Sequence, residues 1–452
     1  PEWAKAIGDL LAADEPNKAL AAAKEAVVNC VRSGDAAGKV AALHAFAKVH
    51  MAKCELLDAM ELGEKALAEL QKAPDQKVEG ALFHTLAKVS RELYRLQDAE
   101  EFGKEALRIF EQAGSKVGEA AVRNTLARIS LRADRRQDAL KMAKQSLAIF
   151  RDCGERDGEA EALHTMARAH SAMRRHEEAL RHANQMVGIY EGGGLEDTER
   201  HSLALLVVAD VRAAAGEHDE AEEAASKAVE LLDGLPGMKV RQAAATRRLA
   251  EACFAKGSDT DAWMYSKEAL EMFRAEGHAK GEAAMLCEVA SAHFRAGSFQ
   301  EGHFIAEECA KLCREGGLKQ QLAHMLHASA RARLDQEAAG NGQGQQLNWR
   351  ARQGAKEALS IYQDIGDLRG QARALGTLAL AFMSYGNVLE GRAKAKAAVE
   401  ICKTIGDRGA EGQNLLLVAQ SRFHDNRDEA ARLAGLAQRL IREHGDKVAL
   451  KD

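Results

Sequence analysis

The sequence predicts an all-α protein, a right-handed α-solenoid of about eleven helix-turn-helix units along its 452 residues. The first observation is a repeat with a period near 40 residues, which is typical of solenoids and propellers. The second is the 3.6-residue spacing of apolar side chains within each repeat, which indicates helices and not strands. Composition agrees, because alanine is abundant and proline, the poorest helix former, occurs only 4 times.

Two columns of small residues mark the repeat. The first column is an alanine that in most units follows an apolar residue, as in Leu126-Ala127. Its members are Ala47, Ala87, Ala127, Ala167, Ala209, Ala250, Ala290, Ala330, Ala379 and Ala419. The second column comprises Ala19, Ala59, Ala99, Ala139, Ala179, Ala221, Ala262, Gly302, Ala351, Gly391 and Ala430. We expect two helices, A and B, to approach each other closely at these positions in every unit.

The B helix follows from the residues after the second column. In one unit, small or apolar side chains return at helical spacing at Ala139, Ala143, Ser146, Leu147 and Phe150. Turns between A and B are expected at glycines, which adopt left-handed conformations at low cost. These are Gly216, Gly257, Gly297 and Gly386. A second glycine-bearing loop, such as residues 154–158, links one unit to the next.

We expect a single continuous array over residues 1–452, interrupted by two irregularities. The units begin near residues 1, 41, 81, 121, 161, 203, 244, 284, 324, 373 and 413. Residues 191–197 lengthen one inter-unit loop, and residues 335–349 form an inserted loop within one unit. The insertion is polar and rich in glycine, so we expect it to be mobile. It is either a tolerated surface insertion or a partner-contacting loop anchored by Trp349.

These features resemble the tetratricopeptide repeat over nearly the whole chain. That family places a large apolar residue beside a small one, then a turn glycine, then an alanine. Here the pattern reads Leu249-Ala250, Gly257 and Ala262. The unit is longer than the usual one, and Gly63, Gly103, Ala143 or Ala183 replaces the aromatic residue of helix B. Long units joined by glycine-bearing linkers are similar to those of kinesin-light-chain and Pins-type adaptors. They are also similar to those of bacterial signalling regulators.

Composition argues against several classes of function. The net charge of -5 and the 4% of aromatic residues are unlike a nucleic-acid-binding domain. No apolar run approaches the roughly 20 residues of a membrane helix. No signal peptide is visible, although the chain begins at Pro1. We expect a protein of a reducing intracellular compartment, in the first place the cytoplasm, or of an organelle after removal of a transit peptide.

The cysteines and histidines suggest no metal, cofactor or catalytic site. Cys309 and Cys313 are one helical turn apart, but equivalent positions in other units are apolar, so buried thiols are the favoured interpretation over a metal or redox pair. The 16 histidines form no metal-binding or catalytic motif. His164 and His170 are six residues apart and do not share a helix face. We therefore expect a protein that is not an enzyme and has no cofactor.

One polar pattern indicates a binding surface. Two residues before the large helix-A residue stand His44, His84, Asn124 and His164, and His327 repeats this position in a later unit. Two residues after it stand Lys48, Lys88, Arg128, Arg168 and, in the later unit, Arg331, while Asp210 and Glu251 occupy this second column in two intervening units. On an isolated helix both columns point away from the core. Below about pH 6.5 the histidines would add positive charge.

The resemblance implies that these two columns line a concave groove. We therefore expect a non-enzymatic scaffold or adaptor that binds an extended, partly acidic peptide or protein segment and belongs to a larger complex. A solvated helix face is the competing interpretation of the columns. Two other functions stay open, a structural subunit held permanently in a complex and a regulator switched by a small ligand. Nucleic acid and membrane insertion are disfavoured.

Overall fold

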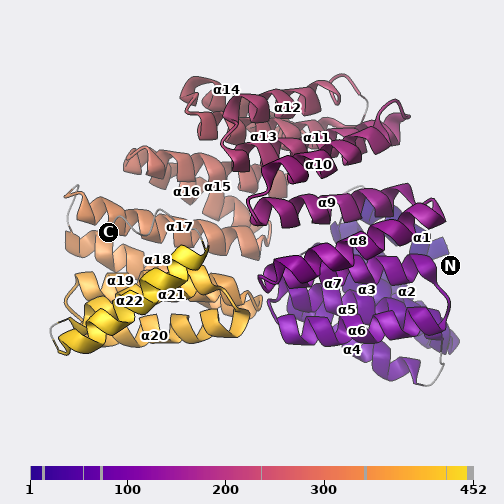
Figure 1. Cartoon of the computed structure of the whole chain (residues 1–452), viewed down its shortest axis with the longest axis horizontal. Helices are drawn as coiled ribbons and strands as arrows, with labels where there is room; N and C mark the ends of the chain where they lie inside the picture. The colour runs from indigo at the N-terminus through magenta and orange to yellow at the C-terminus, as the bar shows by residue number, and fades with distance from the viewer. Residues whose placement is uncertain are drawn as a thin grey trace. The chain divides into compact units, whose positions relative to one another are not determined.

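The fold is entirely helical in the residues that can be described. The computed structural model describes residues 2–12, 16–53, 55–71, 75–235, 237–340, 344–423 and 425–444. These residues form 22 helices and no strand, which gives eleven A–B pairs and confirms the predicted fold class (Figure 1). Within the described ranges no helix combines the length and the apolar character needed to cross a membrane.

Odd-numbered helices are the A helices and even-numbered helices are the B helices. The A helices are α1 (Glu2–Ala12), α3 (Ala36–Ala52), α5 (Gln76–Glu92), α7 (Lys116–Arg132), α9 (Arg156–Ala172), α11 (Leu195–Ala215), α13 (Lys239–Lys256), α15 (Ala279–Arg295), α17 (Lys319–Ala338), α19 (Leu368–Ser384) and α21 (Arg408–Arg422). The B helices are α2 (Pro16–Ser33), α4 (Leu56–Leu70), α6 (Leu96–Gln112), α8 (Arg136–Cys153), α10 (His176–Tyr190), α12 (His218–Glu230), α14 (Asp259–Ala275), α16 (Phe299–Glu315), α18 (Gly344–Asp364), α20 (Val388–Ile405) and α22 (Arg427–His444).

The helices gather into two compact units, residues 1–191 and 192–452. In the first unit each A helix packs against its own B helix, the B helix of the repeat before it, and the neighbouring A helices. The series α3, α5, α7 and α9 therefore forms one layer of adjacent A helices. The expected single continuous array over residues 1–452 stays a prediction.

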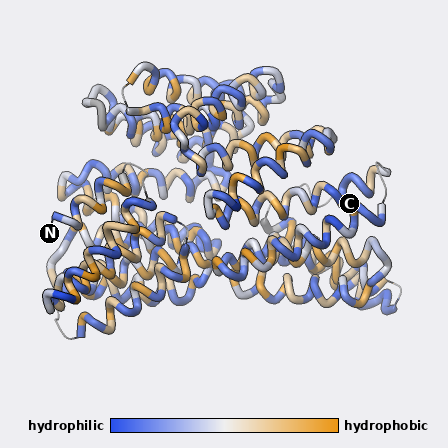
Figure 2. The backbone as a smooth tube through the Cα atoms, turned by 180° about the vertical axis from the view of Figure 1, so that it is seen from behind, coloured by the Kyte–Doolittle hydropathy of each residue, from blue (hydrophilic) through white to orange (hydrophobic). Residues whose placement is uncertain are grey.

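Both columns of small residues are buried, as predicted. Ala127 and Ala139 are fully shielded from solvent, and their lack of side-chain bulk lets α7 and α8 lie close together. Hydrophobic and hydrophilic residues alternate around the helices, as Figure 2 shows. Each helix thus buries one stripe against its neighbours, and no repeat can cover its own stripe alone.

Glycines in the B helices explain the missing family aromatic residue. A Cβ atom at Gly63 would lie 2.6 Å from Cδ2 of Leu86, and one at Gly103 would lie 2.6 Å from Cδ2 of Leu126. The large helix-A residue of one repeat therefore fills the space that an aromatic side chain would occupy on the preceding B helix. At this position the large side chain is on helix A and the small residue is on helix B.

The inter-repeat loop 154–158 uses its two glycines for different purposes. Gly154 ends α8 in the left-handed conformation, with φ of 70°. Gly158 lies in the first turn of α9, where a Cβ atom would collide with the ring of Phe150. One glycine therefore reverses the chain, and the other lets the next A helix pack on the aromatic end of α8.

The insertion at residues 335–349 is mostly helical, so the predicted mobile loop is wrong for its described residues. Helix α17 continues to Ala338 and α18 begins at Gly344, while residues 341–343 lie outside the described residues. Asn348 is fully buried and its Nδ2 donates to Oε2 of Glu337 at 3.3 Å. Trp349 is 53% exposed, and its role as a partner anchor stays a prediction. Glutamine and alanine in the insertion favour helix, which outweighs the glycines.

Candidate functional site

The histidine column joins neighbouring repeats. Nε2 of His44 on α3 lies 2.8 Å from Oγ1 of Thr85 on α5, and Nε2 of His84 lies 2.8 Å from Oγ1 of Thr125 on α7. Each histidine thus reaches the residue just after the histidine position of the next repeat. In the second unit His327 lies 3.0 Å from Oγ1 of Thr377 in the same way.

The threonine hydroxyls fix the direction of these hydrogen bonds. Oγ1 of Thr85 donates to the carbonyl oxygen of Ala81 at 3.0 Å, and Oγ1 of Thr125 donates to that of Ala121 at 3.1 Å. Since each hydroxyl proton is used within its own helix, the threonine oxygen accepts from the histidine Nε2–H. The result is a short chain of donors, from imidazole to hydroxyl to backbone carbonyl, that connects successive A helices.

The prediction that this column lies on an exposed face is therefore wrong. His44 and Asn124 are buried, and His84, His164 and His327 are half-buried. The angular argument treated helix A as an isolated cylinder with one buried stripe. In the array, each A helix is also flanked by the A helices before and after it, which covers residues far from the core stripe.

Burial also keeps these histidines neutral, so the expected gain of charge below pH 6.5 is wrong. The pKa of His44 is lowered to about 3 by burial, with smaller effects from the charges of Lys48 and Lys88. The pKa of His164 is lowered to about 4 by burial and by Arg168 and Arg128. Burial lowers the pKa of His84 well below its ordinary range and that of His327 to about 4.

The cation column is the part of the pattern that faces solvent. Lys48 and Arg168 are exposed, and Lys88 and Arg128 are half-buried. They occupy equivalent positions on α3, α5, α7 and α9, which the histidine–threonine bonds and helix packing hold side by side. In the described part of the chain, none of these four charged groups forms a hydrogen bond or an ion pair.

Two further arginines and a glutamate, which the sequence pattern did not single out, lie beside this column. Nε and Nη2 of Arg91 contact Oε1 of Glu92 at 3.1 and 2.5 Å. Nη2 of Arg132 lies 2.6 Å from the other carboxylate oxygen of Glu92, and its Nη1 donates to the carbonyl oxygen of Arg91 at 2.8 Å. Arg91 follows Lys88 by three residues and Arg132 follows Arg128 by four, so extending the column by one helical turn would have found both.

The cations act on one another through their charge. The pKa of Lys88 is lowered by burial, and Arg91, Lys48 and Arg128 lower it further, against the attraction of Glu161. The pKa of Arg128 is lowered by burial, and Arg168 and Arg132 add to this. Lys48, Lys88, Arg91, Arg128, Arg132 and Arg168 are hereafter called the basic face. It is a region of mutual repulsion in which an anion would be stabilised.

In the second unit the acidic members of the column are neutralised. Arg248 contacts both Asp210 and Glu251, and Arg247 contacts Glu251 at 2.7 Å and also Glu288 of the next A helix. Burial and the Glu251 carboxylate raise the pKa of Glu288. The contact between Arg247 and Glu288 occupies the positions that His44 and Thr85 occupy in the first unit, so it also joins neighbouring repeats.

Arg331 completes the predicted set. Its Nε lies 3.1 Å from Oδ1 of Asp335 one turn later, and both side chains are more than half exposed. A pair of this kind contributes little to stability, because water screens it. The second unit therefore presents paired charges where the first unit presents the basic face.

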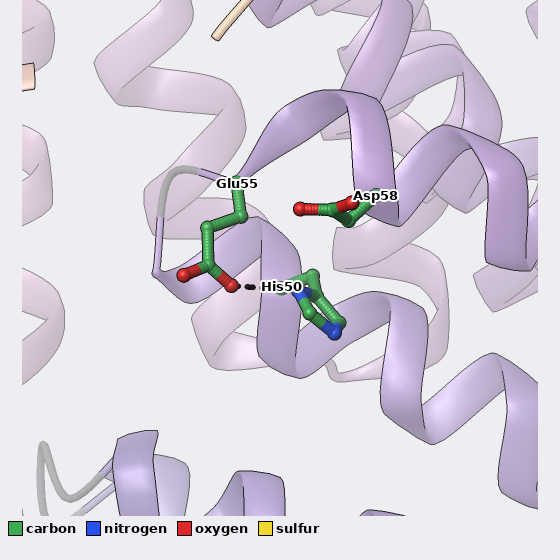
Figure 3. Close-up of side chains that lie close together, drawn as sticks. All are labelled: His50, Glu55 and Asp58. Atoms are coloured by element: carbon green, nitrogen blue, oxygen red, sulfur yellow. Dashed lines mark hydrogen bonds and ion pairs between the residues drawn. The ribbon is translucent and has the colours of Figure 1, made fainter. Parts of the chain in front are cut away.

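One cluster has the donor set of a divalent metal site. Nδ1 of His50 lies 2.7 Å from Oε2 of Glu55, and Asp58 turns toward both, with the three ligand atoms within 4.8 Å of one another (Figure 3). Each group has a local role as well. Nζ of Lys53 lies 3.0 Å from Oε1 of Glu55, and Asp58 stands in the first turn of α4, where a carboxylate stabilises a helix. These roles account for the cluster, and we assign no metal to it.

The thiols of the second unit are packed against one another. Cys309 Sγ lies 3.5 Å from Sγ of Cys287 and 3.9 Å from Sγ of Cys313, and all three side chains are buried. This confirms the expected burial of Cys309 and Cys313. Contact with Cys309 and burial raise the pKa of Cys313, so it stays protonated and unreactive at neutral pH.

Comparisons with known proteins agree with the repeat pattern. The family model of the tetratricopeptide repeat matches residues 78–152 and 118–192. No curated protein matches the chain in sequence.

Several solved structures are similar to the chain. A Rap protein complexed with competence and sporulation factor is 13% identical, with a TM-score of 0.48 over 90% of this chain and 98% of that one. The apo form of the quorum sensor NprR from B. thuringiensis is 11% identical, with a TM-score of 0.43 over 88% and 97%. BtubC from P. vanneervenii is 18% identical, with a TM-score of 0.42 over 48% and 90%.

Proposed function

The chain carries tetratricopeptide repeats, and from this premise we propose that it is a protein-interaction scaffold whose first unit binds an extended acidic segment of a partner protein. The observation that supports the proposal is the run of Lys48, Lys88, Arg128 and Arg168, whose charged groups have no partner among the described residues. Adjacent cations without counter-ions, two of them half-buried, are stabilised by an anion that binds across them. The proposal assigns no catalytic role to the protein.

The spacing of the cations favours an extended partner. They stand at equivalent positions on adjacent A helices, and packed helix axes are about 8–10 Å apart. An extended peptide in the polyproline II conformation advances about 3.1 Å per residue and places every third side chain on the same face. Acidic side chains about three residues apart would therefore meet successive cations, which a helical or compact ligand would not do as readily.

The second unit supports another candidate function, that of a subunit held in a larger complex. Tyr385, Leu389 and Phe423 are 50%, 74% and 54% exposed, and all lie at or next to the A–B turns of two successive repeats. Exposed large apolar side chains in one region are typical of protein interfaces. This surface and the basic face are on different units of the chain, so the two functions are compatible.

The experiment that tests the scaffold function is a charge reversal with a matched control. The variant Lys88→Glu/Arg128→Glu/Arg168→Glu should bind an acidic peptide with glutamate at every third position at least about tenfold more weakly than wild type. Each partly exposed contact is worth about 0.2–1 kcal/mol, and reversal adds repulsion. Binding by wild type should also weaken as salt rises.

The control reverses the same number of charges elsewhere in the first unit. Lys141, Lys144 and Arg181 are exposed on the B helices α8 and α10, away from the basic face. Their change to glutamate should leave the affinity near that of wild type, apart from the long-range effect of net charge. Circular dichroism confirms that both variants are folded. Equal affinities for the two variants at low salt would refute the scaffold function proposed for this face.

A further inference from the structure

The basic face holds more positive charge than its own carboxylates balance. Its six cations are accompanied by two acidic groups that act on them, Glu92 and Glu161. Glu92 is already shared by Arg91 and Arg132, one on each carboxylate oxygen. Glu161 is exposed and acts on Lys88 and Arg128 only through its charge. Six positive charges against two negative ones leave an excess of about four, where one carboxylate of a ligand would supply a single charge.

Arg91 carries a donor that has no acceptor. The residue is 94% buried, since its exposed fraction is 6%, and its Nε and Nη2 are both used by Glu92. Its Nη1 is buried and has no hydrogen-bond partner among the described residues. A buried guanidinium nitrogen without an acceptor is costly, so the arrangement suggests that a ligand atom belongs there.

The charges around Arg91 indicate which kind of ligand would bind to its free Nη1. Arg128 and Arg132 are the cations that most affect Arg91, and Arg91 in turn affects Lys88 and Arg168. Arg91 lies one helical turn after Lys88 on α5, and Nη1 of Arg132 on α7 donates to its carbonyl oxygen, so Arg91 lies beside the column. A phosphoryl group carries between one and two negative charges near neutral pH and three acceptor oxygens. It can accept from Nη1 of Arg91 while its other oxygens accept from Lys88 and Arg128, which one carboxylate with two oxygens cannot do as completely.

We propose that the basic face binds a phosphoryl group on the acidic partner segment, held by Lys88, Arg91 and Arg128, so that phosphorylation of a serine or threonine in the partner strengthens binding. The proposal rests on the scaffold function proposed above and adds the chemical identity of the main anchor. Lys48 and Arg168 then contact ordinary carboxylates on either side of the phosphorylated residue.

A phosphopeptide fits this surface better than a single-stranded nucleic acid. Proteins that bind single strands combine basic residues with exposed aromatic rings on which the bases stack. The aromatic ring beside the basic face is that of Tyr94, and the guanidinium of Arg132 lies over it, 4.7 Å from its centroid. That ring face is therefore occupied. The regular spacing of cations along four A helices instead suits the backbone of an extended peptide.

The test compares three peptides that differ at one position. Each has glutamate at every third position, and the central residue is serine, glutamate or phosphoserine. Affinities are measured by fluorescence anisotropy with the full chain. We expect the phosphoserine peptide to bind at least about tenfold more tightly than both others, because charge-assisted hydrogen bonds to a dianion exceed those to a carboxylate. Inorganic phosphate should compete only at far higher concentration than the phosphopeptide.

Variants locate the anchor. Arg91→Gln should remove most of the gain given by the phosphate and should change the affinity for the glutamate peptide much less. Arg135→Gln is the matched control, since Arg135 is an exposed arginine of the same unit that pairs with Glu100. It should keep the full gain. Arg91→Lys keeps the charge but loses the fork of donors, and it should recover only part of the gain.

Other outcomes separate this inference from the function on which it rests. If the glutamate peptide binds and the phosphoserine peptide binds no more tightly, the phosphoryl anchor is wrong and the scaffold function stands. If none of the three peptides binds the folded protein, the scaffold function is wrong as well. A single-stranded oligonucleotide that binds as tightly as the phosphopeptide, or inorganic phosphate that is equally effective, would also overturn the phosphopeptide assignment.

Discussion

Acidification from pH 7 to pH 5 should destabilise the first unit through two histidines of the column, His44, which joins α3 to α5, and His164 on α9. His44 and His164 have pKa values of about 3 and 4 in the folded chain against an ordinary value of 6.5. The unfolded chain therefore takes up a proton at each site below about pH 6.5, whereas the folded chain does not. Stability is highest above that pH and is lost as the pH falls toward the folded values.

The size of the effect follows from the distance to the unfolded pKa. At pH 5 each histidine is 1.5 units below the ordinary 6.5, and one unit corresponds to about 1.4 kcal/mol, so each site contributes a loss of about 2 kcal/mol. The two sites together should remove about 4 kcal/mol from the free energy of unfolding. Carboxylates with lowered pKa values add little in this window, because even the unfolded carboxyl groups are mostly ionised at pH 5.

The assay is urea unfolding followed by circular dichroism at pH 7 and pH 5, for wild type and for His44→Asn/His164→Asn. Asparagine is the residue that the chain itself carries at this position in one repeat, Asn124. The variant will be less stable at both pH values, so the informative quantity is the change between them. We expect this change to differ between wild type and variant by about 4 kcal/mol.

The reverse substitution provides the matched control. Asn124→His adds a histidine opposite Thr165, whose hydroxyl donates to the carbonyl oxygen of Glu161 as in the neighbouring repeats. This variant should lose more stability on acidification than wild type does. Glu288 acts in the opposite sense in the second unit, because its pKa is raised, and comparing variants removes its contribution. An identical pH dependence in all three proteins would refute the lowered pKa values of the histidines in this column.

Three further predictions concern stability. Gly158→Ala should lower the free energy of unfolding by about 1–3 kcal/mol, because the added Cβ atom would push the ring of Phe150. The control is Gly188→Ala in α10, where a Cβ atom would meet nothing within 4 Å, and it should stabilise the protein by about 0.5–1 kcal/mol. Thermal unfolding measures both variants, and equal shifts would contradict the packing described. Glu288→Gln should raise stability increasingly as the pH rises from 6 to 9, because the buried carboxyl group must otherwise lose its proton; urea titrations with no such trend would contradict the raised pKa. Arg174 adopts φ of 59°, so Arg174→Gly should stabilise by about 1 kcal/mol in the same assay, and a loss of stability would show that its side-chain contacts outweigh the strain.

The sequence predicted the repeats well because they depend on spacing alone. Ala127 and Ala139 recur at a fixed period, and a recurring small residue in a helix indicates a close approach whatever its neighbours are. The turn glycines Gly216 and Gly257 were also predictable, because a left-handed residue is required there and both adopt positive φ. In the first unit Tyr94 stands in a left-handed turn conformation without being glycine, and no sequence pattern indicated this.

The candidate site was predictable only in part, for a physical reason. Lys88 and Arg128 belong to a column that periodicity reveals, and the structure places them on adjacent helices. The burial of His44 and its bond to Thr85 depend on how neighbouring repeats pack, and the face of a single helix contains no such information. The unsatisfied nitrogen of Arg91 depends on where Glu92 directs its carboxylate, which is a property of side-chain conformation and not of spacing.

The histidine–threonine bonds have a consequence for how the chain can change in length. Helix α5 carries both halves of the joint, since Thr85 accepts from the repeat before it and His84 donates to the repeat after it. A duplicated copy of this repeat would bring its own acceptor and its own donor, and both new junctions would match without further substitution. Loss of the repeat would rejoin His44 to Thr125. Because Lys88 belongs to the same repeat, each duplication would also lengthen the row of cations by one, so the reach of the surface toward an acidic partner would grow with the number of copies.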